Sequence, residues 1–236
     1  MGSKFLPGEN DMVSTNHYLL KEWHPTKNIP LTPDQVMPGT GKKIWWLCTR
    51  GHEFLVSGNS RVTFGSGCPY CANKKVWAGF NDLATTAPGL LRDWDFELNV
   101  QISPQEVTLR SGKMVWWKCS KNHSWQATPD ARTGRKTGCP VCQNLKLLVG
   151  YNDLASRFPK IASEFDVAKN GVTPEQVIAG AAKRAWWLCP EGHSYSSTVD
   201  SRCQQGLGCP YCSNRYVLDG WNDLASKNPT LLSEWH

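Results

Sequence analysis

The chain has 236 residues and a formal net charge of +6, with 40% hydrophobic and 19% charged residues. This balance excludes a disordered chain, and no apolar run approaches the roughly 18 residues that span a bilayer, so we predict no membrane segment. The N-terminal residues lack the apolar stretch of a signal peptide, which favours a cytoplasmic protein. Ten cysteines and twelve tryptophans are the unusual counts.

Two strings recur at nearly constant steps. Trp-Trp-x-Cys begins at residues 45, 116 and 186, and Asn-Asp-Leu-Ala begins at residues 81, 152 and 222, so both repeat after 71 and then 70 residues. A weaker copy of the second string begins at Asn10. We therefore predict complete repeats at 1–79, 80–150 and 151–221, followed at 222–236 by the start of a fourth repeat or a C-terminal cap.

Each repeat is predicted to begin with a short helical half. The Asn-Asp pair supplies a capping side chain ahead of Leu-Ala, so four aspartates are expected to be helix caps rather than catalytic acids: Asp11, Asp82, Asp153 and Asp223. A proline seven residues after the Asn is expected to start a second helix in three copies, at Pro88, Pro159 and Pro229. Apolar residues three to four apart would bury one face of that helix: Leu90, Leu91 and Trp94; Ile161 and Phe165; Leu231, Leu232 and Trp235.

A Ser/Thr-Pro-x-Gln/Glu string follows in every repeat, at 32–35, 103–106 and 173–176. It predicts a capping box around one helical turn. Residues 42–48 are then rich in strand formers, and residues 52–56, 123–125 and 193–195 are expected to form the second strand of a hairpin. Because adjacent strand residues face opposite sides, one Trp of each pair should enter the core. The other could cover the helical half or stack on a nucleotide.

Nine of the ten cysteines and three of the six histidines share one spacing, Cys-x3-His-x15-Cys-x2-Cys. Three thiolates and one imidazole make a closed tetrahedral zinc site with no position for catalytic water, and thiolates favour zinc over calcium or magnesium. A disulfide framework is the main alternative, and iron is a possible replacement ion. We predict three structural Zn²⁺ ions and no catalytic residues, with these ligands: Cys48, His52, Cys68 and Cys71; Cys119, His123, Cys139 and Cys142; Cys189, His193, Cys209 and Cys212.

The tenth cysteine, Cys203, lies outside this spacing and is expected to be a small, partly buried side chain.

The combined motifs resemble the treble-clef, or probable zinc-ribbon, repeat domain of bacteria and phages. The matching strings are Trp-Trp-x-Cys, Gly-His, Gly-Cys-Pro-x-Cys, the Gly-x-Asn-Asp-Leu-Ala linker, and a helix Trp followed five residues later by Asn. Asn122 replaces the Gly in the second repeat, and Phe165 replaces the helix Trp in the third. The resemblance implies a tandem array of small α+β zinc modules of about 70 residues, treble-clef-like or zinc-ribbon-like. Since members are sometimes joined to endonuclease-like domains, it also implies a nucleic-acid context in a bacterial cell or a phage-infected host.

Positive charge is concentrated around the predicted ligands. Residues 42–75 hold six basic and one acidic residue, residues 113–146 hold seven and one, and residues 183–215 hold four and two, which leaves −7 on the rest of the chain. A site of three thiolates and one Zn²⁺ adds −1, so the three segments together carry about +10. A repeated basic face suits a polyanion such as duplex DNA.

The candidate nucleic-acid contacts are recurring basic positions: Arg61, Arg132, Arg202, Lys42, Lys43, Lys113, Lys183 and Arg184. Two roles stay open for the three arginines, namely contact with phosphate or a guanine edge and support of the fold through a carboxylate or a Trp. For the lysines the alternative is a solvated surface.

The sequence thus predicts a non-catalytic tandem zinc-finger protein that binds nucleic acid, double-stranded DNA in preference to RNA. Neither a phosphate loop nor a pair of catalytic carboxylates is visible, so we do not expect an enzyme. The alternatives are a zinc-stabilised scaffold for a protein partner and the targeting part of a larger nuclease.

Overall fold

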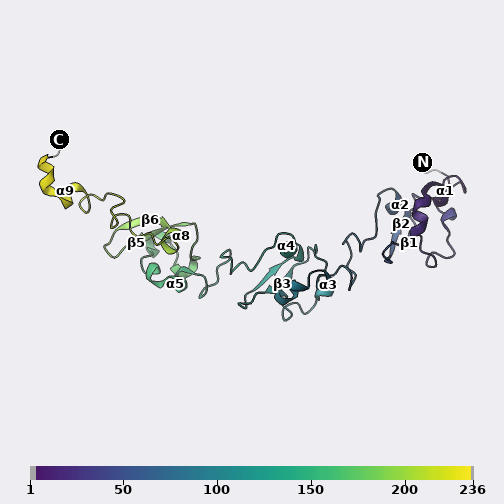
Figure 1. Ribbon diagram of the computed structural model, residues 1–236, viewed down its shortest axis with the longest axis horizontal. Helices are drawn as coiled ribbons and strands as arrows, with labels where there is room; N and C mark the ends of the chain where they lie inside the picture. The colour runs from purple at the N-terminus through teal and green to yellow at the C-terminus, as the bar shows by residue number, and fades with distance from the viewer. Residues whose placement is uncertain (1–3, 235–236) are drawn as a thin grey trace. The chain divides into compact units, whose positions relative to one another are not determined.

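The computed structural model describes residues 4–234, which form short helices and small hairpins in turn along the chain (Figure 1). These residues make two compact units, one of 4–118 with 126–136 and the other of 119–125 with 137–234. The division passes through the second repeat, so the repeat boundaries given above stay a prediction. Among residues 4–234, no helix has both the length and the apolar character that crossing a bilayer requires.

A short α-helix begins each helical half, and its N-cap is the aspartate of the Asn-Asp string, as predicted. In the second repeat the backbone N–H of Thr85 donates to Asp82 Oδ1 at 2.8 Å. The backbone N–H of Gly79, which adopts a left-handed φ of 80°, donates to the second oxygen of Asp82 at 2.5 Å. The four capped helices are α1 (Met12–Asn16), α3 (Leu83–Thr86), α5 (Leu154–Arg157) and α9 (Leu224–Lys227).

The segment predicted as a second helix is helical, and in three copies it takes the 3-10 form. In the second repeat it closes with an i to i−3 hydrogen bond from Trp94 N to Leu91 O at 3.1 Å, and Trp94 is already extended. Helical segments as short as these often adopt the tighter 3-10 form. These elements are η1 (His17–Glu22), η3 (Pro88–Asp93) and η6 (Pro229–Glu234). Trp235, placed by sequence in the last of them, lies outside the described residues.

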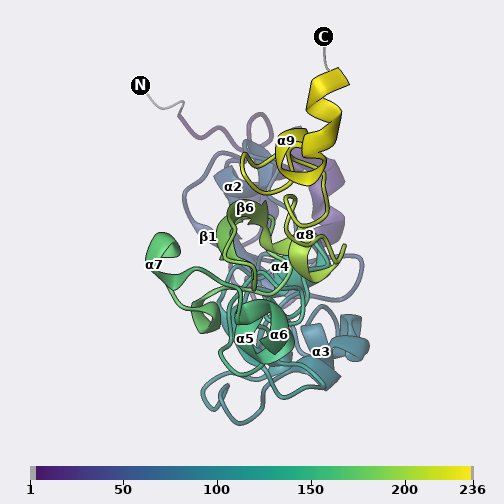
Figure 2. The same cartoon turned by 90° about the vertical axis from the view of Figure 1, so that its left-hand side faces the viewer.

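The third repeat differs from the others in this region. It has α6 (Pro159–Ala162), which follows α5 directly (Figure 2). It also has an additional helix, α7 (Val167–Asn170), which ends at Gly171 in the left-handed conformation. Gly171 lies where this repeat is one residue shorter than the others, so the deletion coincides with a local change of conformation.

All three predicted capping boxes are present. In the second repeat the backbone N–H of Ser103 donates to Glu106 Oε2 at 2.7 Å, and the Ser103 hydroxyl donates to the same oxygen at 2.9 Å. The residue after this turn, Val107, accepts a backbone hydrogen bond from Leu83 at 2.8 Å, which ties the turn to helix α3. The turns are η2 (Pro33–Gln35), η4 (Pro104–Glu106) and η5 (Pro174–Gln176).

The predicted hairpins are present as three two-stranded sheets, with strand ends one to three residues from the expected ones. In the first register Trp46 lies opposite Phe54, and in the third Trp187 lies opposite Tyr195. The strands are β1 (Lys43–Leu47) with β2 (Glu53–Ser57), β3 (Val115–Lys118) with β4 (Ser124–Ala127), and β5 (Arg184–Leu188) with β6 (Ser194–Thr198).

A further α-helix, which the sequence analysis missed, follows the second strand of each hairpin. The sequence feature that could have predicted this helix is a Ser or Thr at its N-cap. The side chain of that residue accepts a hydrogen bond from the backbone N–H three residues later, as Ser57 does from Ser60 at 3.1 Å. These helices are α2 (Gly58–Val62), α4 (Pro129–Thr133) and α8 (Val199–Cys203).

One Trp of each tandem pair forms the centre of the core, as strand alternation predicts. The inner rings are 0% exposed: Trp46, Trp117 and Trp187. Each meets an aromatic ring from the end of the helical half edge to face, with centroids 6.0, 5.5 and 5.4 Å apart. Each indole N–H also donates to a carbonyl on the second strand, at 3.3, 2.9 and 3.1 Å, so the polar edge of the buried ring is satisfied.

The outer Trp of each pair is held by an asparagine side chain that acts as a short strand partner. In the second repeat Asn99 Nδ2 donates to Trp116 O at 2.7 Å, and Trp116 N donates to Asn99 Oδ1 at 2.9 Å. Asn28 and Asn170 make the same pair of bonds in the other repeats. This contact explains the fixed spacing between the helix aromatic residue and the Asn. It joins the helical half to the free edge of the first strand.

The aspartate cap gives a first testable prediction. Burial alone would raise the pKa of Asp82, but hydrogen bonds from Thr85 and Gly79 lower it below its usual value, so the cap is ionised at neutral pH. Asp82→Ala should reduce the free energy of unfolding by about 1 kcal/mol, measured by urea titration with zinc present. Asp82→Asn, which keeps a capping oxygen, should lose clearly less. Equal losses in the two variants would contradict the cap role.

Candidate metal centres

The four predicted ligands of the first repeat converge on one point. Cys48 Sγ lies 3.5 Å from His52 Nδ1 and 3.8 Å from Cys71 Sγ. His52 Nδ1 lies 3.7 Å from Cys68 Sγ and 3.3 Å from Cys71 Sγ. The ring nitrogen that faces the three sulfurs is therefore Nδ1.

The other two sets have the same geometry. Sulfur to Nδ1 distances are 3.3 to 3.6 Å around His123 and 3.3 to 3.7 Å around His193. The first and last cysteines of each set are 3.9 and 3.8 Å apart. In every set the four ligand atoms lie within 4.8 Å of one another. The remaining cysteine, Cys203, is partly buried against the core of the third repeat, as expected.

The donor geometry fits zinc. A tetrahedron with Zn–S bonds of about 2.3 Å has sulfur–sulfur edges of about 3.8 Å, which is the separation found here. All ten cysteines lie in the described range and all are free thiols, so the disulfide framework is not formed. Each of the three sets can hold one zinc ion, and four protein ligands fill its tetrahedral shell.

Electrostatics shows why such a cluster needs a cation. Burial and the neighbouring thiols of Cys68 and Cys48 raise the pKa of Cys71 to about 12, because its thiolate is desolvated beside other sulfurs. The equivalent thiols, Cys142 and Cys212, rise to about 11 and about 12 for the same reasons. A divalent cation reverses this balance and deprotonates the thiols that coordinate it.

The first two ligands of each set are positioned by the turn of the hairpin. In the first repeat Cys48 N donates to His52 O at 3.0 Å, and Gly51 N donates back to Cys48 O at 2.9 Å. Gly51 needs a left-handed φ of 81° for this turn. Asn122 takes the same position in the second repeat with a φ of 62°, and Asn is the residue that tolerates this conformation best after Gly. The departure from the family pattern therefore preserves the backbone.

The start of the next repeat covers the zinc-facing histidine. The rings of Phe80, Tyr151 and Trp221 lie 4.2, 4.3 and 4.6 Å from those of His52, His123 and His193, centroid to centroid. The following Asn then binds the loop that contains and follows the Cys-x2-Cys pair, since Asn81 Nδ2 donates to the carbonyls of Tyr70 at 2.8 Å and Lys75 at 2.9 Å. This role was not predicted from the sequence, although an aromatic residue recurs directly before each of these asparagines.

The three recurring arginines lie inside the fold. Each guanidinium pairs with an acidic side chain at the end of the helical half, Arg61 with Glu22 at 2.7 Å, Arg132 with Asp93, and Arg202 with Glu164 at 2.5 Å. Each also lies over the inner Trp ring, at 5.8, 5.0 and 5.2 Å from the centroid. Their side chains are only 13, 7 and 7% exposed. The sequence left two roles open for these arginines, contact with nucleic acid and support of the fold. The arrangement found here is the one that supports the fold.

The other predicted contact residues are exposed and lie at or just before the first strand of each hairpin: Lys42, Lys43, Lys113, Lys183 and Arg184. None of them forms an ion pair with another described residue. Arg184 instead donates to the Ser196 hydroxyl at 3.3 Å and to the Ser196 carbonyl at 3.2 Å. The exposed basic surface therefore comes from the strand starts rather than from the arginines of the core.

Comparison with known proteins agrees with these sites. The profile of a family described as "Probable Treble clef zinc finger domain" matches residues 19–74, 90–145 and 161–215, together more than half of the chain. A protein of Escherichia phage T5 named "Putative endonuclease" is 30% identical over 122 residues. The aligned part is 52% of this chain and 39% of the phage protein, so the chain spans well under two thirds of that relative.

Zinc content provides a direct prediction. The purified chain should hold three zinc ions, Cys48→Ser should hold two, and the matched control Cys203→Ser should still hold three. Chelation by EDTA should abolish the near-ultraviolet circular dichroism of the buried tryptophans, because metal binding supplies folding free energy in small modules. A loss of one zinc from Cys203→Ser, or a spectrum unchanged by chelation, would count against these sites.

The core arginine gives another prediction. Arg132→Ala should lower the free energy of unfolding by about 1–3 kcal/mol, because the partly buried Asp93 loses its closer cationic partner and keeps only Arg92 at 3.6 Å. The exposed neighbour Arg135 is the matched control, and Arg135→Ala should change stability by no more than about 0.5 kcal/mol. If Arg132→Ala stays as stable as the control and loses only nucleic-acid binding, its role is contact rather than support.

Proposed function

The chain belongs to the probable treble clef zinc finger domain family, and from that membership we propose that it is a non-catalytic array binding nucleic acid, double-stranded DNA in preference to RNA. In this proposal the array consists of zinc modules at 1–79, 80–150 and 151–221, followed at 222–236 by the start of a fourth repeat or a C-terminal cap. Its place is the cytoplasm of a bacterial cell or a phage-infected host, where thiols stay reduced and available to zinc.

The observation that carries the proposal is the repeated exposed lysine before each hairpin. Lys42, Lys113 and Lys183 occupy equivalent positions, are exposed, and are free of ion pairs with described residues. A lysine without a salt bridge to a described carboxylate is available to a phosphate, and each phosphate contact releases counterions from the polyanion. Lys43 and Arg184 extend the same basic surface in the first and third repeats.

The three core arginines have a different place in this proposal. Their guanidinium groups already bind a carboxylate and cover a Trp, so they act on nucleic-acid binding through the stability of the module that presents the lysines. The total positive charge is highest in the first two zinc segments and lowest in the third. We therefore assign most of the polyanion affinity to the first two repeats.

The phage relative supports a second form of the same proposal. Its printed name is that of an endonuclease, and the aligned part is less than half of its length. Modules of this kind would then act as the targeting part of a larger nuclease, while another part of that protein would carry the catalytic residues. The four-ligand zinc sites agree with a targeting role, because they leave no coordination position for a catalytic water.

The proposal predicts strongly salt-dependent binding to duplex DNA. A chain carrying Lys42→Ala, Lys113→Ala and Lys183→Ala should bind more weakly, and the slope of log K against log salt should become shallower by about 0.9 for each phosphate that these lysines no longer neutralise. The measurement is a fluorescence anisotropy titration of a labelled duplex at several salt concentrations.

A triple variant with the same change of charge is the control. Lys4→Ala, Lys21→Ala and Lys160→Ala remove three exposed lysines outside the zinc segments and should leave the slope nearly unchanged. The proposal fails if the wild-type chain binds neither duplex DNA, single-stranded DNA nor RNA at low salt. Equal slopes for the two triple variants would show that binding follows total charge rather than the surface described here.

A further inference from the structure

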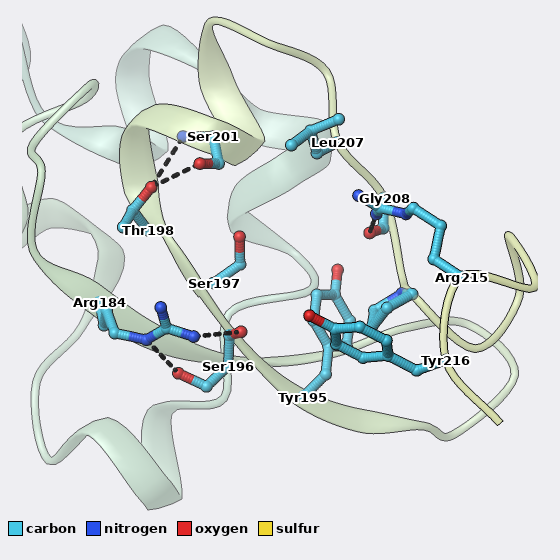
Figure 3. A pocket seen from close by; sticks show the side chains of 11 residues that line it. Arg184, Tyr195, Ser196, Ser197, Thr198, Ser201, Leu207, Gly208, Arg215 and Tyr216 are labelled. Atoms are coloured by element: carbon cyan, nitrogen blue, oxygen red, sulfur yellow. Dashed lines mark hydrogen bonds between the residues drawn. The ribbon is translucent and has the colours of Figure 1, made fainter. Parts of the chain in front are cut away.

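The third repeat contains a cavity of about 230 Å³ beside its hairpin. Strand β6, helix α8 and the segment around the last cysteine pair form its walls. Figure 3 shows Arg184 on one side and Arg215 on the other, with the hydroxyl groups of Tyr195, Ser197 and Tyr216 directed into the space between. None of the four zinc ligands of this repeat is among the residues that line the cavity.

A buried hydroxyl in this cavity has no hydrogen-bond partner among residues 4–234. Tyr195 is 3% exposed, and its phenol oxygen is buried without a hydrogen bond to any described residue. The Ser197 hydroxyl likewise makes no hydrogen bond within the described part of the chain, although its carbonyl accepts one from Trp187. Buried polar groups are nearly always paired, so an unpaired phenol in a cavity wall indicates a ligand that accepts a hydrogen bond.

The charge of the cavity identifies the ligand as an anion. Two arginines and no carboxylate are among the residues that line it. Arg215 is held by bonds to the Gly208 carbonyl at 2.9 Å and the Ser213 hydroxyl at 3.0 Å, and Arg184 is held by Ser196. A guanidinium has five N–H donors, so both keep donors for a ligand while these bonds restrict their motion.

The other two repeats serve as an internal comparison, and neither combines these groups. Phe54 and Trp125 occupy the position of Tyr195, and neither places a hydroxyl there. The position of Ser197 holds Val56 and Ala127. The second repeat also replaces both arginines by apolar residues, Met114 and Leu145. The shared fold therefore does not require this set of donors, which is a property of the third repeat alone.

We propose that the cavity binds a phosphomonoester. A phosphate joined to one ester oxygen presents three free oxygens, enough to meet both arginines and the hydroxyls between them. A phosphodiester within a strand has two free oxygens and two bulky substituents, so it enters a cavity of this size poorly. The exposed ring of Tyr216 at the rim offers a stacking surface for an attached base. The source of the group is the phosphorylated end of a nucleic-acid strand or a free nucleotide.

The test compares ligands that differ only in the phosphate. The zinc-loaded full chain is titrated by anisotropy with a short oligonucleotide bearing either a 5′-phosphate or a 5′-hydroxyl, and by calorimetry with adenosine 5′-monophosphate and with inorganic phosphate. We expect the 5′-phosphate to bind at least tenfold more tightly than the 5′-hydroxyl. Adenosine monophosphate binding as tightly as the phosphorylated strand would assign the site to free nucleotides, and weaker binding would assign it to strand ends.

Substitutions taken from the other repeats keep the test independent of folding. Tyr195→Phe and Arg215→Leu reproduce side chains of the first and second repeats, and each should reduce the preference for the phosphate about tenfold while zinc content stays at three. Lys74→Leu, the change equivalent to Arg215→Leu in the first repeat, is the control and should leave the preference intact.

Equal affinity for both oligonucleotides, together with no heat from either small phosphate, would overturn the proposal. A phosphate preference that survives both Tyr195→Phe and Arg215→Leu would overturn it too. The site does not depend on the polyanion binding proposed above. Loss of salt-dependent duplex binding with retained monophosphate binding would reject only the earlier proposal.

Discussion

The requirement that three sulfurs and one imidazole nitrogen meet within a few ångströms dominates each repeat. One pair of ligands lies at the turn of a two-stranded hairpin, and the other pair comes from the segment that closes the repeat. A hairpin of four or five residues per strand is marginal by itself. One cation bound by all four ligands joins the turn of the hairpin to the segment that closes the repeat, so both parts of the zinc-bearing half are held in place. The same four ligands fill a tetrahedral zinc shell and leave no position in it for a water molecule.

A second set of contacts joins the helical half to this zinc-bearing half. The inner Trp is enclosed by an aromatic ring from the helical half and by an arginine that binds a carboxylate from that half. The asparagine clamp adds two hydrogen bonds at the strand edge. Apolar contact, ionic pairing and backbone pairing thus act across one boundary. This concentration explains how a repeat of about 70 residues forms a defined core with few helical residues.

Much of this organisation could be predicted from the sequence because it depends on local chemistry. The cap aspartates, the capping boxes and the inward Trp each follow from residues a few positions apart, and the zinc ligands were found because their longer spacing recurs three times in the chain. What could not be predicted depends on contacts between distant segments. The partner of Arg132 is 39 positions away, so its spacing alone could not separate a buried ion pair from an exposed phosphate contact. The 3-10 helix Pro88–Asp93 ends where the backbone becomes extended at Trp94, which packs against the hairpin. No local sequence pattern predicts where that change occurs.

The adjacent residues Asn81 and Asp82 bind in opposite directions along the chain. The first holds the loop of the preceding zinc segment, and the second starts the helix of the following repeat. The contact that closes one zinc segment and the cap that begins the next helix therefore come from adjacent residues. A first repeat excised from the array therefore needs Asn81 to hold its closing loop, whereas the repeat after it needs Asp82 to cap its first helix.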